Sequence, residues 1–211
     1  MTNFIPIFPL NIVVFPGEQL NLHIFEPKYK QLIRECFNEK KVFGIPAVIN
    51  GSISETGAVV SIISIEKEHE NGEMDIKTEG IKLFSLIEII KEIPDKLYSG
   101  AIVSYPENST TGIESKMKKI LEEVRYFHEL LEVNKEYKKD DKALCTYDIA
   151  HHVGMSLEQE YEFVNLMRED QRQEYIQRHL KKIIPTIEEL QNLKKRIQMN
   201  GHFRKLSIED L

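Results

Sequence analysis

The 211-residue sequence contains no tryptophan and only two cysteines, Cys36 and Cys145, which lie far apart and outside any CxxC pair. Sparse, unpaired cysteines are typical of reduced thiols in a cytoplasmic protein rather than of a disulfide-stabilised secreted one. The first residues begin neither a basic segment nor a long apolar run, so we expect no signal peptide. No apolar run approaches the roughly 20 residues that span a bilayer. The sequence therefore predicts a cytoplasmic protein that does not cross a membrane.

Motifs for nucleotide and metal chemistry are also missing. The sequence holds neither GxGxxG nor GxxxxGK[ST], which excludes a loop of the kind that cradles phosphates. His128 begins a segment like the zinc-protease motif HExxH, but Glu132 stands where the second histidine must be. His151 and His152 are neighbours, and adjacent side chains on a helix diverge by about 100° and chelate poorly. We therefore expect no metal and no cofactor.

A cysteine nucleophile has little support, because a reactive thiol needs a basic or electropositive neighbour. Cys36 falls on the apolar stripe of a predicted helix, which favours packing in the core. Cys145 falls in a predicted loop and has no basic neighbour closer in sequence than Lys142. The sequence predicts no catalytic residue, and a hydrolase would require one of these thiols to be exposed beside a histidine in a cleft.

The net charge of −6 disfavours nonspecific binding to nucleic acid or to anionic lipid. The strongest basic run, Lys194-Lys195-Arg196, is short and lies on a predicted helix. A nucleic-acid site would need a broader basic patch with interleaved aromatic residues. Binding to a protein or a peptide therefore fits the composition better than binding to RNA.

Residues 1–106 are rich in short apolar segments separated by turn signals, a pattern typical of a β-barrel or a sandwich. Pro27 suits the first turn of a helix that is expected over 28–38. Asn71-Gly72 favours a type I′ hairpin turn. The predicted strands are Ile5–Phe8, Ile12–Phe15, Leu20–Phe25, Phe43–Ile49, Ala58–Glu66, Met74–Thr78, Ile81–Ile90 and Ile102–Tyr105.

Residues 113–211 change to a helical period, after a polar, turn-prone boundary at 107–112. Ser156 and Gln159 have the spacing of a capping box at a helix start. Pro185 is expected to interrupt a later helix, which Thr186 then starts again and which ends near Met199. The predicted fold class is α+β: a sheet domain with one helix, followed by a C-terminal helical bundle.

Three pieces of the opening segment, Phe8-Pro9-Leu10, Val13–Gly17 and Leu22–Tyr29, together resemble the N-terminal substrate-binding domain of the ATP-dependent Lon proteases. Gly44, the strand Gly57–Val60 and a turn at Glu79-Gly80 fit the same pattern. The resemblance covers about residues 4–105, and the helices through residue 200 resemble the bundle that accompanies this domain. The form IFEPKY is particularly similar to the short, stand-alone members of the family.

This resemblance implies a small barrel-like sheet of PUA-like topology and a role in recognising unfolded or tagged polypeptides. In the proteases, the region also contributes to oligomer assembly, so an oligomer is one expectation. The 211 residues hold neither the ATPase module nor the Ser–Lys peptidase module of that family, and we expect neither activity from them. The implied function is a non-enzymatic protein-binding module, which could act as an adaptor to a Lon-type protease.

The expected contact residues are Phe25, Pro27 and Tyr29, near the start of the first helix, and Tyr98, in the loop after Pro94. Peptide binding of this kind uses an apolar groove or an exposed sheet edge. An RNA- or small-ligand-binding module stays open as the alternative, because PUA-like folds carry such roles and a fold does not fix a function.

Overall fold

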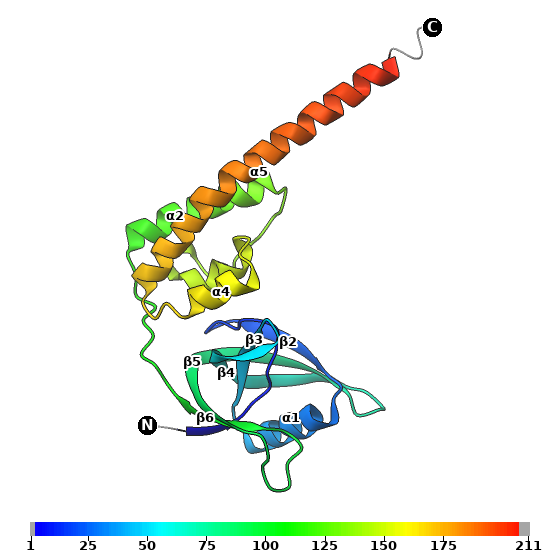
Figure 1. Ribbon diagram of the computed structural model, residues 1–211, viewed down its shortest axis with the longest axis vertical. Helices are drawn as coiled ribbons and strands as arrows, with labels where there is room; N and C mark the ends of the chain where they lie inside the picture. Colours follow the sequence, from blue (N-terminus) through cyan, green and yellow to red (C-terminus); the bar gives the residue numbers. More distant parts are fainter. Residues whose placement is uncertain (1–2, 207–211) are drawn as a thin grey trace.

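The computed structural model describes the backbone of residues 3–206 and the side chains of residues 3–198. The first half is a six-stranded antiparallel sheet, which curls into a barrel below the helices (Figure 1). The strands pair in the order β1-β6-β5-β4-β3, and β2 pairs with β5. Their bounds are β1 (Asn3–Pro6), β2 (Gln19–Ile24), β3 (Phe43–Ile49), β4 (Ser52–Glu68), β5 (Met74–Ile90) and β6 (Gly100–Ser104).

The residues that follow β1 join the two ends of this strand order. Ile7 and Leu10 form parallel bridges with Gly44 and Ala47 of β3. The amide of Phe8 donates to the carbonyl oxygen of Gly44 at 2.8 Å. The sheet therefore closes on itself, which removes the unpaired edges that β1 and β3 would otherwise present.

Strand β5 is one 17-residue strand, so the prediction of two strands with a turn at Glu79-Gly80 is wrong. The register shifts between Val59, which pairs with Lys82, and Val60, which pairs with Gly80. This bulge bends the strand without ending it. A Cβ at Gly80 would lie 2.3 Å from the carbonyl oxygen of Phe15, so the close approach of that chain requires a glycine.

The hairpin between β4 and β5 is present, but its turn is not the predicted type I′. That turn needs a positive φ at both central residues. Within this turn only Gly72 has a positive φ, at 75°. The amide of Gly72 donates to the carbonyl oxygen of His69, and the amide of His69 donates to that of Glu73, both at 2.8 Å. This pattern is a type I turn followed by a glycine in the left-handed conformation.

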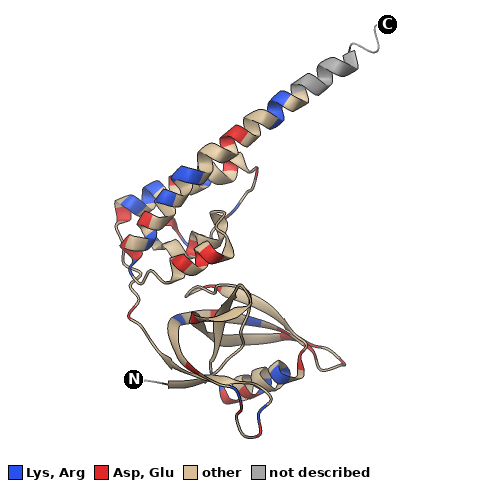
Figure 2. Cartoon of the chain, viewed as in Figure 1, with Lys and Arg blue, Asp and Glu red and all other residues tan. Residues whose placement is uncertain are grey.

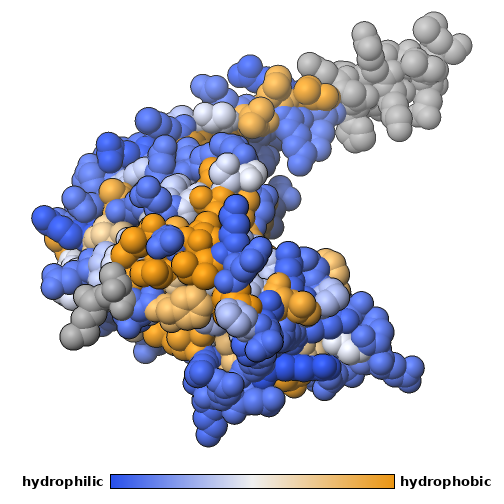
Figure 3. Space-filling view, turned by 60° about the horizontal axis from the view of Figure 1, so that its bottom comes forward, coloured by the Kyte–Doolittle hydropathy of each residue, from blue (hydrophilic) through white to orange (hydrophobic). Residues whose placement is uncertain are grey.

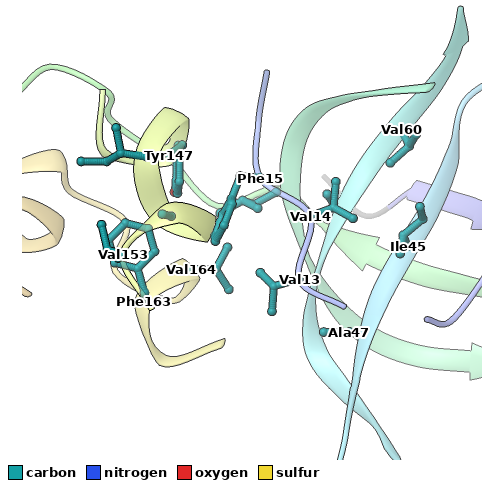
Figure 4. Close-up of a cluster of buried hydrophobic side chains, with 14 of the residues drawn as sticks. Val13, Val14, Phe15, Ile45, Ala47, Val60, Tyr147, Val153, Phe163 and Val164 are labelled. Carbon is teal, nitrogen blue, oxygen red and sulfur yellow. The ribbon is translucent and has the colours of Figure 1, made fainter. Parts of the chain in front are cut away.

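The segment Ile12–Phe15, predicted as a strand, is irregular; Ile12 is half-buried and the other three residues are buried. It lies between the barrel and the helices (Figure 4). The Phe15 side chain is 0% exposed, and its ring centroid lies 5.4 Å from that of Tyr147 and 5.7 Å from that of Phe163. Its apolar side chains contact the barrel on one side and the helices on the other. The segment therefore forms no strand, although its composition is typical of one.

The helices are α1 (Pro27–Glu39), α2 (Glu114–Leu130), α3 (Thr146–Ile149), α4 (Leu157–Val164) and α5 (Glu169–Leu206), with short 3-10 turns at Asp141–Ala143 and Ala150–His152. Helix α1 begins at Pro27, as predicted, and the capping box of Ser156 and Gln159 is formed at the start of α4. The predicted break at Pro185 is wrong, because α5 continues through it as one helix of 38 residues. The hydroxyl of Thr186 donates to the carbonyl of Lys182, one turn back, instead of capping a new helix.

Two hydrophobic clusters occupy opposite faces of the sheet, as shown by neighbouring residues of β4: Val59 belongs to one cluster, and Ala58 and Val60 to the other. The larger cluster continues from the barrel through Phe15 into the helices. The α+β prediction, a sheet with one helix followed by C-terminal helices, is confirmed. Within residues 3–206, no helix has both the length and the apolar character of a membrane span.

A buried ion pair joins residues 105–113, which connect β6 to α2, to the C-terminal helices. Arg172 and Glu169 are 0% and 1% exposed, and their side chains form an ion pair at 2.8 Å. Arg172 donates to the side chain of Asn108 at 3.0 Å and to the carbonyl of Ser109 at 2.6 Å. Thr146 donates its amide and its hydroxyl to the carboxylate of Glu169. We call Asn108, Thr146, Glu169 and Arg172 the closed cluster.

Candidate peptide-binding surface

Strand β2 is an edge strand, because β5 is its one strand partner among residues 3–206. The amide of Gly80 and the hydroxyl of Thr78 donate to the carbonyls of Glu18 and Leu20, so these even-numbered residues of the segment face β5. Hydrogen-bonded positions alternate along an antiparallel pair. The amide and carbonyl of Asn21 therefore point away from β5, where an incoming strand could pair with them.

A groove of about 640 Å³ lies over the sheet where β2, β5 and β4 adjoin, since most of its lining residues come from these three strands. Leu22 is half-buried and Ile76 is 1% exposed, so polar and charged side chains of both signs dominate the lining. Lys138, from the segment after α2, lines the groove and donates to the side chain of Gln19 at 3.1 Å. The remaining lining residues are Asn21, His23, Glu66, Asp75 and Lys77.

The surface continues from β2 into the start of α1, where three of the predicted contact residues lie. Phe25 is 58% exposed, and Pro27 is also exposed. Tyr29 is half-buried, with its ring centroid 3.9 Å from that of Phe8 and the ammonium of Lys28 4.6 Å from its own. Phe25 and Pro27 thus present apolar surface directly after the open edge, and Tyr29 presents part of its ring.

The fourth predicted residue, Tyr98, lies beneath the surface. Its side chain is 8% exposed, and its hydroxyl donates to Glu35 of α1 at 2.5 Å. Burial and this carboxylate raise the pKa of Tyr98, so the phenol stays protonated. Its neighbour Leu97, which the sequence analysis did not select, is a large apolar residue that is 67% exposed. The amide of Leu97 is held by the side chain of Gln31 at 2.8 Å.

A cluster of two histidines and a carboxylate lies at the end of β2, next to Phe25. His23 Nδ1 lies 2.7 Å from Asp75 Oδ1, and His69 Nε2 lies 2.8 Å from Asp75 Oδ2. The hydrogen bond to Asp75 raises the pKa of His23, and the two histidines lower the pKa of Asp75. We call His23, His69 and Asp75 the open cluster. It is the part of the surface that sequence reasoning missed, because the register of β2 on β5 brings its members together.

The other histidines that the sequence analysis considered are used within the fold. His128 bonds the carbonyl of His152 at 2.6 Å. Burial lowers the pKa of His152 to about 4, so its ring is neutral. His151 bridges Glu160 of α4, at 2.8 Å, and Glu18 of the barrel, at 3.2 Å. Burial alone would lower the pKa of His151, but hydrogen bonds to these two carboxylates outweigh it and raise the pKa to about 9.

The two cysteines lack the environment of a nucleophile. Cys36 is 3% exposed, and burial raises its pKa to about 12. Burial and the neighbouring carboxylates of Asp148 and Glu169 raise the pKa of Cys145 to about 11. Both thiols are therefore protonated at neutral pH, which disfavours a thiolate nucleophile.

A second apolar region lies away from β2. Phe4 of β1 and Ile87 of β5 are 53% and 55% exposed, and the space-filling view shows apolar side chains gathered over one side of the molecule (Figure 3). The sequence analysis did not select these residues. They provide a comparison for the surface built on β2.

Residues 5–202 match the family model described as the substrate-binding domain of the ATP-dependent protease La (LON). The fold is similar to that of the Lon N-terminal domain protein from Xanthomonas campestris, with 20% identity, a TM-score of 0.63, and coverage of 82% of this chain and 95% of that one. It is also similar to the N-terminal domain of the Lon protease from the Mycobacterium avium complex, with 13% identity, a TM-score of 0.64, and coverage of 85% and 98%. No match was found among the curated proteins.

Proposed function

The chain belongs to the Lon substrate-binding domain family, and from that premise we propose that it binds extended segments of unfolded polypeptides along the free edge of β2. The observation that carries the proposal is the continuity of this edge with the exposed side chains of Phe25 and Pro27. Strand addition supplies backbone hydrogen bonds that are independent of the ligand sequence, and apolar contacts supply the preference for unfolded segments.

Several features of the surface support this assignment. The groove over β2, β5 and β4 adjoins this edge and offers further surface to a bound segment. Its lining mixes Glu66 and Asp75 with Lys77 and Lys138, so no single charge is demanded of the ligand. Phe25, Pro27 and part of Tyr29 then offer a rigid apolar contact at one end. Tyr98 supports α1 from below through Glu35 and is a positioning residue in this proposal.

The test is a fluorescence-anisotropy titration of the protein against a reduced and alkylated unfolded protein and its folded counterpart. Replacing Asn21 by proline removes the outward amide while keeping a residue that edge strands accept. We expect Asn21→Pro and Phe25→Ala each to weaken binding of the unfolded protein by about fivefold to thirtyfold, corresponding to about 1–2 kcal/mol.

Ile87→Ala is the matched control, because Ile87 is as exposed as Phe25 but lies outside the β2–β5 pairing. It should leave the affinity unchanged. A loss of binding in Ile87→Ala, with none in Asn21→Pro or Phe25→Ala, would assign recognition to the second apolar region instead. Equal affinity for folded and unfolded proteins would contradict the proposal as a whole.

The finer role we propose is that of a non-enzymatic adaptor in the cytoplasm, delivering bound polypeptides to a Lon-type protease. Its test is the degradation rate of an unfolded client by a purified Lon protease, with and without this chain. Acceleration that Phe25→Ala abolishes would support delivery, whereas slower degradation would indicate that the chain only shields its client.

Charge distribution favours a protein ligand over RNA, the alternative left open by the sequence. Lysine and arginine residues on α2 and α5 are interspersed with acidic residues (Figure 2). Lys116 of α2, for instance, pairs with Glu174 of α5 at 2.9 Å. Such mixed surfaces lack the continuous basic stripe by which proteins track a phosphate backbone.

A further inference from the structure

The open cluster has the donor atoms of a transition-metal site. One nitrogen from each of His23 and His69 and an oxygen of Asp75 lie within 4.8 Å of one another. Two imidazoles and one carboxylate form a ligand set that suits Zn²⁺ and related divalent ions. All three side chains reach solvent: 49% of His23, 42% of Asp75 and 29% of His69 are exposed. An ion could therefore enter, and water could complete its coordination.

The backbone fixes these side chains near one another before any ion arrives. His23 and Asp75 are direct partners across the β2–β5 pair. His69 stands at the end of the β4–β5 hairpin, where its amide and carbonyl bond Glu73 and Gly72. Side chains placed by paired strands and a closed turn lose little conformational freedom on binding a ligand. The positions are thus set by the same register that forms the barrel.

From this geometry we propose that His23, His69 and Asp75 bind a Zn²⁺ ion, through His23 Nδ1, His69 Nε2 and a carboxylate oxygen. The proposal does not depend on the proposed function. Zn–N bonds of about 2.0–2.1 Å place tetrahedral ligands about 3.3 Å apart. The 4.8 Å span is therefore closed by small rotations of exposed side chains.

Glu73 has a separate, positioning role in this site. Both histidine nitrogens that face Asp75 must carry a lone pair to bind the ion, so the proton of His23 moves to Nε2. His23 Nε2 lies 3.3 Å from Glu73 Oε2, which can accept that proton in a hydrogen bond. A carboxylate on the outer nitrogen fixes the tautomer and the orientation of a metal-binding histidine.

The test uses the full chain without an affinity tag, titrated with Zn²⁺ against a chromophoric zinc indicator at pH 7.5. We expect one equivalent of Zn²⁺ to bind in the micromolar range. His23→Ala and Asp75→Asn should each weaken binding at least tenfold, and Glu73→Gln by about tenfold. Millimolar Mg²⁺ should not displace the ion, because imidazole ligands disfavour Mg²⁺.

His151→Gln is the control, because His151 also lies between two carboxylates, Glu18 and Glu160. The His151→Gln variant should bind Zn²⁺ with the same affinity as the unchanged protein. Co²⁺ gives a second readout, since a site of two histidines and a carboxylate gives visible absorption bands that His23→Ala should abolish. Absence of binding at 100-fold excess, or binding that His23→Ala and Asp75→Asn leave unchanged, would overturn the proposal.

Discussion

The closed cluster and the open cluster contain similar chemical groups in opposite surroundings. In the closed cluster, Arg172 is 0% exposed and has five hydrogen-bond partners, among them Glu169 and the carbonyl of Ser109. In the open cluster, Asp75 is shared by two histidines whose other surfaces face solvent. All three guanidinium nitrogens of Arg172 donate hydrogen bonds within the fold. The side chains of His23, His69 and Asp75 instead keep solvent-exposed surface that a ligand can reach.

This difference separates structural polar groups from candidate binding groups. A buried charge is costly unless its partners surround it. The closed cluster therefore keeps a single arrangement of side chains and links the segments that contribute them. Forming an exposed cluster costs little desolvation free energy, and the cluster contributes little to the stability of the fold. It can therefore exchange its internal hydrogen bonds for bonds to a ligand. Three measurements test this distinction.

The largest effect is expected from breaking the closed cluster. Arg172→Met leaves the buried carboxylate of Glu169 without its cation and should lower the free energy of unfolding by about 3–5 kcal/mol. Urea denaturation measures the loss. Arg168→Met is the control on the same part of the chain, because the Arg168–Asp170 pair is exposed and should contribute little to stability. Equal losses in both variants would contradict the distinction.

An intermediate effect is expected from His151, which connects the barrel to α4 through Glu18 and Glu160. The pKa of His151 is raised to about 9 in the folded state, above the model-peptide value of 6.5, so folding favours the protonated ring. Its contribution is complete below pH 6.5 and declines as the pH rises toward 9. The free energy of unfolding should fall by about 1–2 kcal/mol across this interval.

Urea denaturation at pH 6.0, 7.5 and 9.0 measures this decline. His151→Gln should flatten the curve, because glutamine keeps hydrogen-bonding capacity but does not titrate in this range. A decline of the same size in His151→Gln would assign the pH dependence to other groups.

The smallest effect on stability is expected in the open cluster. With a chelator present, Asp75→Asn should leave the free energy of unfolding nearly unchanged, because the carboxylate and its partners are exposed. With Zn²⁺ added, only the unchanged protein should become more stable, since an ion that binds the folded state shifts the unfolding equilibrium. Thermal unfolding with and without Zn²⁺ measures both quantities. A loss of stability with chelator as large as that of Arg172→Met would place Asp75 among the structural groups.

Local patterns predicted much of the fold. Pro27 at the start of α1 and the capping box at Ser156 were identified because each depends on a few consecutive residues. At Gly80 the backbone of Phe15 packs against the glycine, and the expected turn becomes a bulge. Pro185 is exposed, and α5 continues through it while contacting α2 on both sides of the proline. In both places, contacts between segments distant in sequence accompany a departure from the local preference.

The candidate site shows the same limit more strongly. Phe25 and Pro27 could be selected because they adjoin a recognisable segment. His23, His69 and Asp75 could not, since they meet only through the register of β2 on β5 and the form of one turn. The closed cluster was missed for a related reason, as Arg172 and Glu169 look like an ordinary solvated pair in a charged helix. Composition alone does not reveal which charged residues a fold will bury.

The burial of Phe15 has a consequence for how the chain reaches this structure during synthesis. Its ring packs against Tyr147 and Phe163, which leave the ribosome long after the strands of the barrel. Until then, the segment formed by Val13, Val14 and Phe15 lacks the contacts that the C-terminal helices later provide. The barrel therefore passes through an intermediate with exposed apolar surface, the condition under which nascent proteins aggregate or engage chaperones. The protein for which we propose recognition of unfolded chains thus begins as a candidate for such recognition itself.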